Sequence, residues 1–247
     1  MKKKLVILSG AGISAESGIA TFRDSVDGLW NNFRIDEVCS PEAWATDPTK
    51  VNDFYNMRRI EVLNASPNKA HIALAEAEKY FDIHIVTQNV DDLHERAGST
   101  KVLHLHGEML KARSSNPCYD WAGMSPDPKI NSYKTYPVDR KGLTMNDLAD
   151  DGFPLRPDIV FFGESVPNIG KASDIIKEAD ILIVVGTSLN VYPAASLVWD
   201  TKPTCLTYCV DPEASQEEAG FPCVVVTARA TQGIPMVLNK LKAKFNL

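Results

Sequence analysis

The feature that most constrains this chain is a glycine-rich stretch near its start, at residues 9–23 (SGAGISAESGIATFR). A short apolar run at 5–8, typical of a buried parallel strand, precedes it. Gly10 and Gly12 allow a sharp turn and a close approach to a ligand, and a helix start after them favours phosphate. Strand, glycine turn and helix begin a dinucleotide-binding fold. The alternative is a loop whose glycines only pack a helix on a sheet.

The spacing of these glycines departs from that of the dehydrogenases. Gly10, Gly12 and Gly18 form G-x-G-x5-G, so the fingerprint G-x-G-x-x-G is not met. Thr21, Phe22 and Arg23 add a hydroxyl, an aromatic ring and a cation just beyond the glycines, which a plain hydride-transfer site does not need.

The length, composition and charge limit the classes of protein to which this chain can belong. The chain has 247 residues, of which 44% are hydrophobic and 23% charged, which suits one large domain or a domain with an insert. No apolar run approaches the roughly 18 residues that span a membrane, and the first one ends at Leu8, too early for a signal peptide. We therefore expect a cytoplasmic protein. The net charge of −6 argues against a nucleic-acid partner held by phosphate contacts.

The cysteines favour a reduced compartment. They are five, an odd number, and no two have C-x2-C spacing, so a zinc ribbon made of two such pairs is absent. Cys205 and Cys209 fall in a strand-like stretch, which favours small buried residues over a redox role.

Apolar runs alternate with helical patterns along most of the chain. Strands are expected at 5–8, 83–87, 102–105, 159–162, 181–185, 204–210 and 224–226, and helices at 68–80, 170–179 and 234–245. This alternation predicts an α/β fold with a doubly wound, parallel, Rossmann-like sheet.

Two segments depart from this alternation of strands and helices, and they predict a smaller lobe. Residues 30–67 are mostly helical in pattern, and residues 113–153 are rich in polar residues and proline with little periodicity. We expect a single domain over 1–247, with the Rossmann-like part at about 1–29, 68–112 and 154–247. The lobes would enclose a ligand cleft.

Polar residues follow three of the expected strands, at the edge where ligands bind in open α/β sheets. Gln88, Asn89 and Asp91 could bond ribose hydroxyls or a carboxamide, although Asn89 or Asp91 could instead cap a helix. His106, just before a glycine, is better placed than His104 to act as a base at neutral pH. The Gly-Thr-Ser turn at 186–188 offers N–H groups and hydroxyls to a phosphate or ribose.

Together these residues resemble the sirtuins, which are NAD-dependent protein-lysine deacylases. Four blocks match in order, namely GAGIS at 10–14 with TFR at 21–23, TQNVD at 87–91, HG at 106–107 and GTS at 186–188. The resemblance covers nearly the whole chain except 113–153, and points to the bacterial subgroup (class III) that removes succinyl and acetyl groups.

The resemblance implies roles for individual residues. NAD, consumed as co-substrate, would contact Gly10, Ala11, Gly12, Glu16, Thr21, Phe22, Arg23, Trp30, Gln88, Asn89, Asp91, Gly186, Thr187, Ser188, Cys209, Asp211 and Ala230. The family often has asparagine where Cys209 stands. The catalytic residues would be His106 and Asn89, and Val160, Phe161 and Gly163 would contact an acyl-lysine peptide.

The implied reaction consumes NAD without reducing it. The acyl-lysine oxygen attacks the nicotinamide ribose, nicotinamide leaves, and His106 serves as general base on a ribose hydroxyl. The products are free lysine, nicotinamide and O-acyl-ADP-ribose.

A finer prediction concerns the acyl group. Tyr55 and Arg58 are three residues apart and share a face if the segment is helical. A phenol and a guanidinium suit a terminal carboxylate, and sirtuins that remove succinyl or malonyl groups carry the same Tyr-x-x-Arg pattern. The alternative is a surface helix whose arginines are solvated.

The clearest departure from the family is the zinc site. Most sirtuins hold the small lobe with four cysteines, whereas Cys118 is alone in this region here and Ser114 stands near a ligand position. We expect no zinc, and packing through residues such as Tyr136 in its place.

Two other functions stay open. The first is an NAD glycohydrolase or ADP-ribosyltransferase, in which another nucleophile replaces the acyl-lysine. The second is a non-catalytic module that binds NAD or ADP-ribose. The expected partners are acyl-lysine proteins or peptides, and we expect a monomer.

Overall fold

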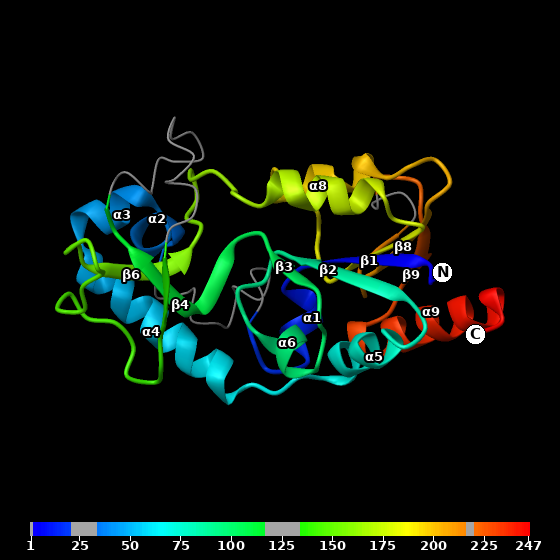
Figure 1. Cartoon of the computed structure of the whole chain (residues 1–247), viewed down its shortest axis with the longest axis horizontal. Coiled ribbons are helices and arrows are strands. Elements are labelled where there is room, and N and C mark those ends of the chain that lie inside the picture. Colours follow the sequence, from blue (N-terminus) through cyan, green and yellow to red (C-terminus); the bar gives the residue numbers. More distant parts are fainter. Residues whose placement is uncertain (1, 21–33, 117–133, 216–219) are drawn as a thin grey trace.

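The computed structural model describes residues 2–20, 34–116, 134–215 and 220–247. These residues form two lobes that lie side by side along the longest axis (Figure 1). The larger lobe contains a six-stranded sheet, and the smaller contains a three-stranded sheet and three helices. None of the described helices has both the length and the apolar character needed to cross a membrane.

The larger lobe contains most of the elements. Its strands are β1 (Lys4–Ser9), β2 (Asp82–Thr87), β3 (Val102–His104), β7 (Ile181–Val185), β8 (Leu206–Val210) and β9 (Val224–Val226). Its helices are α1 (Gly12–Ala15), α5 (Lys69–Ala77), α6 (Leu93–Arg96), α8 (Ile169–Lys177), the 3-10 helix η3 (Ala194–Asp200) and α9 (Ala230–Phe245).

The larger sheet confirms the predicted doubly wound architecture. Its strand order is β3-β2-β1-β7-β8-β9, and every neighbouring pair is parallel. The chain winds outward from β1 in one direction and then from β7 in the other. The point where the order reverses therefore lies between β1 and β7, and ligands of open α/β sheets bind at such a point.

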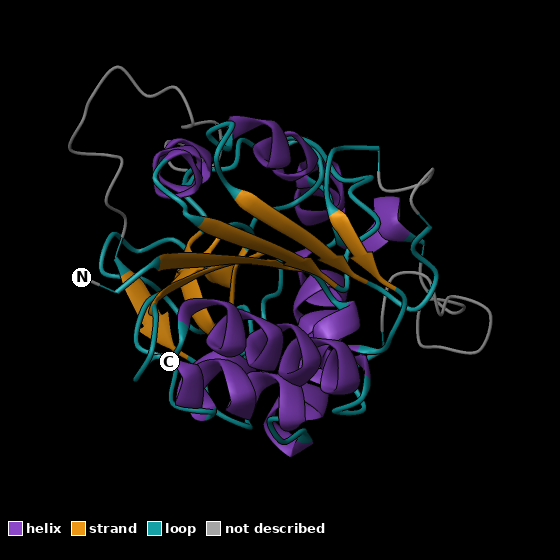
Figure 2. Ribbon diagram, turned by 90° about the vertical axis from the view of Figure 1, so that its right-hand side faces the viewer, coloured by secondary structure: helices purple, strands orange, loops and turns teal. Residues whose placement is uncertain are grey.

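Alternating side chains of the strands build two hydrophobic layers. In β1, Leu5 and Ile7 face a core shared with α5 and α9, whereas Val6 and Leu8 face a core shared with α8 and η3. All four side chains are fully buried, which explains why the run carries no polar alternation. Figure 2 shows the sheet edge-on between its helical layers.

The smaller lobe confirms the predicted helical character of the described part of 30–67. It contains α2 (Ile35–Val38), α3 (Pro41–Thr46) and α4 (Pro48–Asn64). Ser40 caps α3 and Asp47 caps α4, each by accepting a bond from a backbone N–H of the first turn.

The sheet of the smaller lobe was not predicted correctly. It consists of β4 (Gly107–Ser114), β5 (Thr135–Pro137) and β6 (Leu155–Ile159), paired antiparallel in the order β5-β4-β6. Residues 107–112 and 155–159 thus belong to the smaller sheet, although we expected them in the larger part. The strand expected at 159–162 is wrong except for Ile159, its first residue.

Buried charge explains why β6 escaped prediction. All five of its residues are buried, yet they include Arg156 and Asp158, so the strand lacks an apolar run. Arg156 forms an ion pair of 2.7 Å with Glu164, and Arg113 of β4 pairs with the same carboxylate at 3.2 Å. Mutual pairing allows these charges to be buried.

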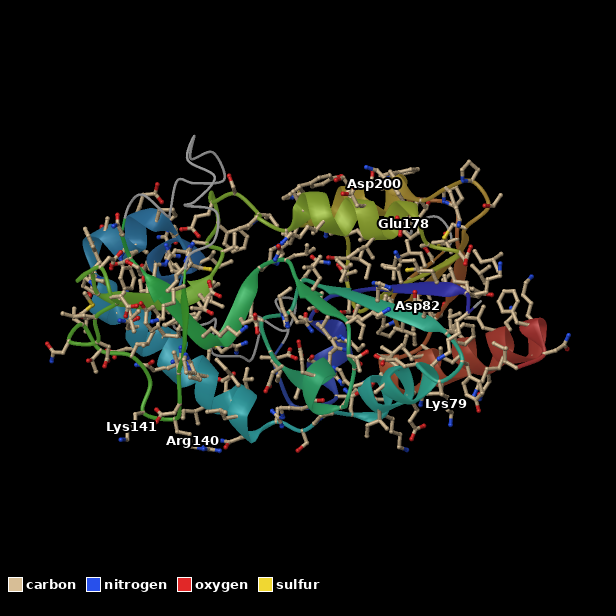
Figure 3. The ribbon with its side chains drawn as sticks, viewed as in Figure 1. Lys79, Asp82, Arg140, Lys141, Glu178 and Asp200 are labelled. Carbon is tan, nitrogen blue, oxygen red and sulfur yellow. The ribbon has the colours of Figure 1, made fainter. Side chains whose placement is uncertain are left out.

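Charged pairs of another kind mark the amino ends of the parallel strands. Lys4 pairs with Glu178, and Lys202 with Asp180, where β1 and β7 begin. Figure 3 shows Asp82 and Glu178 within the larger lobe and Arg140 at the lower edge of the smaller one, and Figure 1 shows that β1 begins on the side of the larger lobe away from the smaller lobe. The carboxyl ends of the strands therefore point toward the smaller lobe.

Three glycines bring two loops into contact at the point where the strand order reverses. A Cβ on Gly12 would lie 2.6 Å from Cα of Gly186, and one on Gly10 would lie 2.7 Å from the carbonyl oxygen of Gly186. The N–H groups of Gly10 and Gly12 donate to the carbonyls of Val185 and Gly186. Neither Gly10 nor Gly12 has a positive φ. The expected turn is present, because the N–H of Ile13 donates to the carbonyl oxygen of Gly10 at 3.1 Å, but it needs no left-handed backbone. Loop packing therefore explains why glycine stands at these two positions.

Gly186→Ala tests this contact. Gly186 has a φ of +62°, and a Cβ there would lie 2.4 Å from the backbone nitrogen of Ile13. We expect the free energy of unfolding, measured by urea denaturation, to fall by more than about 2 kcal/mol.

The control is Gly170→Ala in α8, where a Cβ would meet open space. Alanine favours the helix, so we expect stability to be unchanged or to rise by up to about 1 kcal/mol. Equal losses in the two variants would contradict the packing argument.

Candidate active site

Predicted cofactor residues follow the carboxyl ends of four parallel strands. Gly10, Gln88, Gly186 and Asp211 follow directly on β1, β2, β7 and β8. The parallel registers place these ends in one row facing the smaller lobe. The helix α1 has only four residues and contributes Ser14, and the loops supply the other polar groups here.

One hydrogen bond joins two of the predicted motifs. The side-chain amide of Gln88, after β2, donates at 3.1 Å to Oγ1 of Thr187, after β7, past the end of β1 that lies between them. Thr187 also accepts from the N–H of Leu189, which has a positive φ of 54°. The Gly-Thr-Ser turn is therefore held in a fixed shape beside Gln88.

Ser14 links Asn89 and Asp91. The Asn89 amide donates to Oγ of Ser14 at 3.1 Å, and Ser14 donates to Oδ2 of Asp91 at 3.0 Å. Oδ1 of Asp91 accepts from the N–H of Leu93, but the N-cap of α6 is Asp92, so the alternative that Asn89 or Asp91 caps this helix is wrong. Burial raises the pKa of Asp91, and these bonds oppose that rise. Ser14 was missed, although it stands beside the glycines as a fully buried hydroxyl.

The two histidines at the end of β3 differ in what their rings can do. His104 is buried, and both ring nitrogens are engaged, Nδ1 with the carbonyl of Asn89 and Nε2 with Glu95. Burial lowers the pKa of His104, but the Glu95 carboxylate, the Asn89 carbonyl and Glu108 together raise it above its usual value. Both ring nitrogens of His104 are therefore occupied by bonds within the fold.

His106 keeps one nitrogen for chemistry. Its Nδ1 lies 3.1 Å from the carbonyl oxygen of Gln88. A carbonyl only accepts, so Nδ1 carries the proton and Nε2 carries the lone pair. Within the described residues Nε2 has no hydrogen-bond partner. Burial lowers the pKa of His106, which favours the neutral ring. The arrangement suits a general base.

Glu16 follows α1 directly and bonds to the first turn of α9. Its carboxylate accepts from the N–H of Thr231 at 3.1 Å and from its hydroxyl at 2.8 Å. The carboxylate thus caps the first turn of α9, whose preceding residue Arg229 provides no side-chain cap. Ala230, the first residue of α9, is buried beside this cap. Glu16 therefore anchors α9 as well as bordering the predicted cofactor site.

The remaining predicted cofactor residues occupy different surroundings. Ser188 is exposed and Ala11 half-buried, whereas the side chain of Cys209 packs in the core beneath α8 and η3. Burial raises the pKa of Cys209 to about 12, so its thiol stays neutral, as predicted for a structural cysteine. Asp211 is buried and accepts from the N–H of Glu213. Thr21, Phe22, Arg23 and Trp30 lie outside the described residues.

The segment after β6 joins the two lobes at His106. The N–H of Val160 donates to the carbonyl oxygen of His106 at 3.0 Å. The ring of Phe161 is buried and stacks on that of Tyr55 with centroids 5.9 Å apart. Gly163 is exposed two residues further on. The structure thus brings the predicted peptide-contacting residues beside the candidate base.

Glu164 and Arg156 fix the position of Phe161 and were missed by sequence reasoning. Oε2 of Glu164 accepts from the N–H of Phe161 at 2.7 Å. The Arg156 guanidinium lies 3.8 Å from the centroid of the Phe161 ring. The signal available in the sequence was an isolated acid directly after Gly163.

Tyr55 and Arg58 are enclosed rather than solvated. The Tyr55 side chain is 4% exposed, and its hydroxyl lies 3.0 Å from Sγ of Cys39. Arg58 is buried and pairs with Glu61 at 2.7 Å. Arg59 is also buried and donates to neutral acceptors, the carbonyl of Met109 and the side chain of Asn56. The alternative of a surface helix with solvated arginines is therefore wrong.

Comparison with known proteins assigns this arrangement to a family. The model of the Sir2 family matches residues 10–193. A Helicobacter pylori protein named NAD-dependent protein deacylase is 53% identical over 242 residues, which are 97% of each chain. The chain belongs to the Sir2 family.

Solved structures agree with the sequence match. A Sir2 homologue in complex with NAD is 36% identical, with a TM-score of 0.80 over 98% of this chain and 91% of that one. A Sir2 protein in complex with a deacetylated peptide and 3'-O-acetyl ADP ribose is 27% identical. Its TM-score is 0.75 over 97% of this chain and 94% of that one.

Proposed function

We propose that this chain is an NAD-dependent protein-lysine deacylase, and that it removes succinyl and malonyl as well as acetyl groups. The observation that carries the proposal is the junction of the lobes, where His106 with its available Nε2 lies beside Val160 and Phe161. The names of the relatives, and the NAD and peptide complexes of the structural neighbours, support the same activity.

The residues at the reversal point of the sheet suit NAD. Amides of Gln88 and Asn89 and hydroxyls of Thr187 and Ser188 are donors and acceptors for ribose hydroxyls, phosphates and a carboxamide. When bound, NAD supplies the ribose carbon to which the acyl oxygen is transferred. We propose that Asn89 orients the ribose and that His106 takes a ribose hydroxyl proton at Nε2.

The proposed function also includes the substrates, the products, the oligomeric state and the location of the protein. The substrates are acyl-lysine side chains of proteins or peptides, whose backbone pairs with the segment at 160–163. We propose that the chain acts as a monomer in the cytoplasm. Products are the free lysine, nicotinamide and O-acyl-ADP-ribose.

The assigned base predicts a pH dependence. Neutral His106 is the active form, and burial lowers its pKa below the ordinary 6.5. We therefore expect kcat/KM for deacylation to fall on its acid side only below about pH 6.5, as the ring gains a proton. His106→Asn should lower the rate at least about 100-fold.

The control is His84→Asn at the amino end of the sheet, where His84 pairs with Asp82. It should keep the activity and its pH profile. Normal turnover by His106→Asn would refute the assignment of the base.

The acyl preference is tested with matched succinyl-lysine and acetyl-lysine peptides and NAD, following peptide mass and nicotinamide together. Arg58→Met removes the guanidinium and should lower kcat/KM for the succinyl peptide about 10- to 100-fold, with little change for the acetyl peptide. Arg140→Met, an exposed arginine that bonds Asn64, is the control and should change neither.

Equal losses for both peptides in Arg58→Met would show that the pocket is misassigned. Nicotinamide release without deacylation would point to a glycohydrolase or transferase. No turnover with either peptide would favour the alternative of a non-catalytic module that binds NAD or ADP-ribose.

We also propose that the small lobe folds without zinc. Ser114, near an expected ligand position, donates to both oxygens of Asp151, and the N–H of Asp150 donates to the hydroxyl of Tyr136. These hydrogen bonds connect Ser114 and Tyr136 to residues 150–151. Elemental analysis of the purified chain should find far less than one zinc per chain, whereas near-stoichiometric zinc would disprove the proposal. Cys118, Tyr119, Trp121 and Tyr133 lie outside the described residues.

A further inference from the structure

The ion pair between Arg58 and Glu61 is enclosed. Both residues lie on α4, three positions apart, and Nη1 of Arg58 is 2.7 Å from Oε2 of Glu61. Their side chains are only 11% and 24% exposed. Side chains on a helix tilt toward its amino end, so Glu61 reaches back over Arg58. Solvent therefore screens this pair less than a surface pair.

Glu61 uses only part of its bonding capacity. Its Oε1 is buried and has no hydrogen-bond partner within the described part of the chain. Burial raises the pKa of Glu61, and Arg58 opposes that rise. A buried carboxylate with one unbonded oxygen destabilises the fold, and its attraction to Arg58 offsets only part of that loss.

Glu164 shows what a fully bonded buried carboxylate looks like in the same lobe. Both of its oxygens are bonded, Oε1 by Arg156 and Oε2 by Arg113 and the N–H of Phe161. Such a carboxylate is fixed in place. The contrast with Glu61 indicates that Glu61 can move at a smaller cost.

The pair also lies next to the proposed acyl site. Arg58 shares a helix face with Tyr55, whose ring stacks on Phe161, and the neighbouring Val160 bonds the carbonyl of His106. A continuous series of contacts therefore runs from the candidate base to the helix that carries Arg58 and Glu61.

We propose that Glu61 is a specificity-determining residue that pairs with Arg58 when the acyl group is neutral and is displaced by an acyl group that ends in a carboxylate. This inference rests on the proposed function of Tyr55 and Arg58. The carboxylate of Glu61 neutralises the guanidinium while an acetyl group is bound, because a neutral acyl group cannot do so. A succinyl or malonyl group brings its own carboxylate and must compete with Glu61. The residue thus broadens the acyl range and weakens the binding of acidic groups.

Glu61→Gln tests the proposal because it keeps the size of the side chain and removes the charge. KM and kcat are measured at saturating NAD with succinyl-lysine and acetyl-lysine peptides of one sequence. We expect KM for the succinyl peptide to fall about three- to tenfold, KM for the acetyl peptide to stay level or rise, and both kcat values to change little. Asp53→Asn, an exposed acid on the same helix, is the control and should change none of these values.

The outcomes separate this inference from the proposed function. If Arg58→Met loses succinyl activity selectively but Glu61→Gln leaves the ratio of the two KM values unchanged, the inference fails and the acyl pocket stands. If Arg58→Met affects both peptides equally, the pocket fails and the inference fails with it. A general loss of structure in Glu61→Gln would appear as equal effects on both peptides and a lowered melting temperature.

Glu61→Asp then decides the matter, since it keeps the charge but draws it away from Arg58 by one methylene group. The ratio of KM for the succinyl peptide to KM for the acetyl peptide should shift in the same direction as in Glu61→Gln, by a smaller factor. An unchanged ratio in Glu61→Asp would overturn the proposal.

Discussion

The ligand-binding end of this molecule depends on how closely two loops approach each other. The loop after β1 and the loop after β7 touch through Gly10, Gly12 and Gly186, with no room for a Cβ on any of the three. This contact sets the positions of Ser14 on one side and Thr187 on the other, from which Asn89, Asp91 and Gln88 take their bonds. The glycines therefore shape the proposed cofactor site by packing against one another.

Buried charge organises the second lobe as hydrophobic packing organises the first. Arg113, Arg156 and Glu164 join the small sheet to the segment that carries Phe161, so a fixed ionic cluster positions an aromatic wall. Along α4, Arg58 and Glu61 form a simpler pair whose carboxylate is incompletely bonded. One lobe thus contains a fully bonded charge cluster and a second, incompletely bonded ion pair to which we assign a role in acyl recognition.

The sequence predicts the larger sheet well because its strands are apolar on both faces, as Leu5, Val6, Ile7 and Leu8 illustrate. It predicts β6 poorly because Arg156 and Asp158 have the pattern of a loop until their partners are known. His106 could be chosen over His104 by its place before a glycine, and the structure gives the physical reason in the bonds of each ring. Ser14 and Glu164 stand near glycines, but their contacts with Asp91 and Arg113 come from distant parts of the chain. Glu61 lies only three positions from Arg58, and the sequence does not show that this pair is enclosed.

The bond between Glu16 and Thr231 has a consequence for when the protein can fold during its synthesis. These residues are 215 positions apart, and the loop contact at Gly12 and Gly186 is also long-range. During synthesis the first strand and its glycines leave the ribosome long before their partners exist. The cofactor edge can therefore close only when almost the whole chain has been translated, and the nascent protein must keep β1 from mispairing until then.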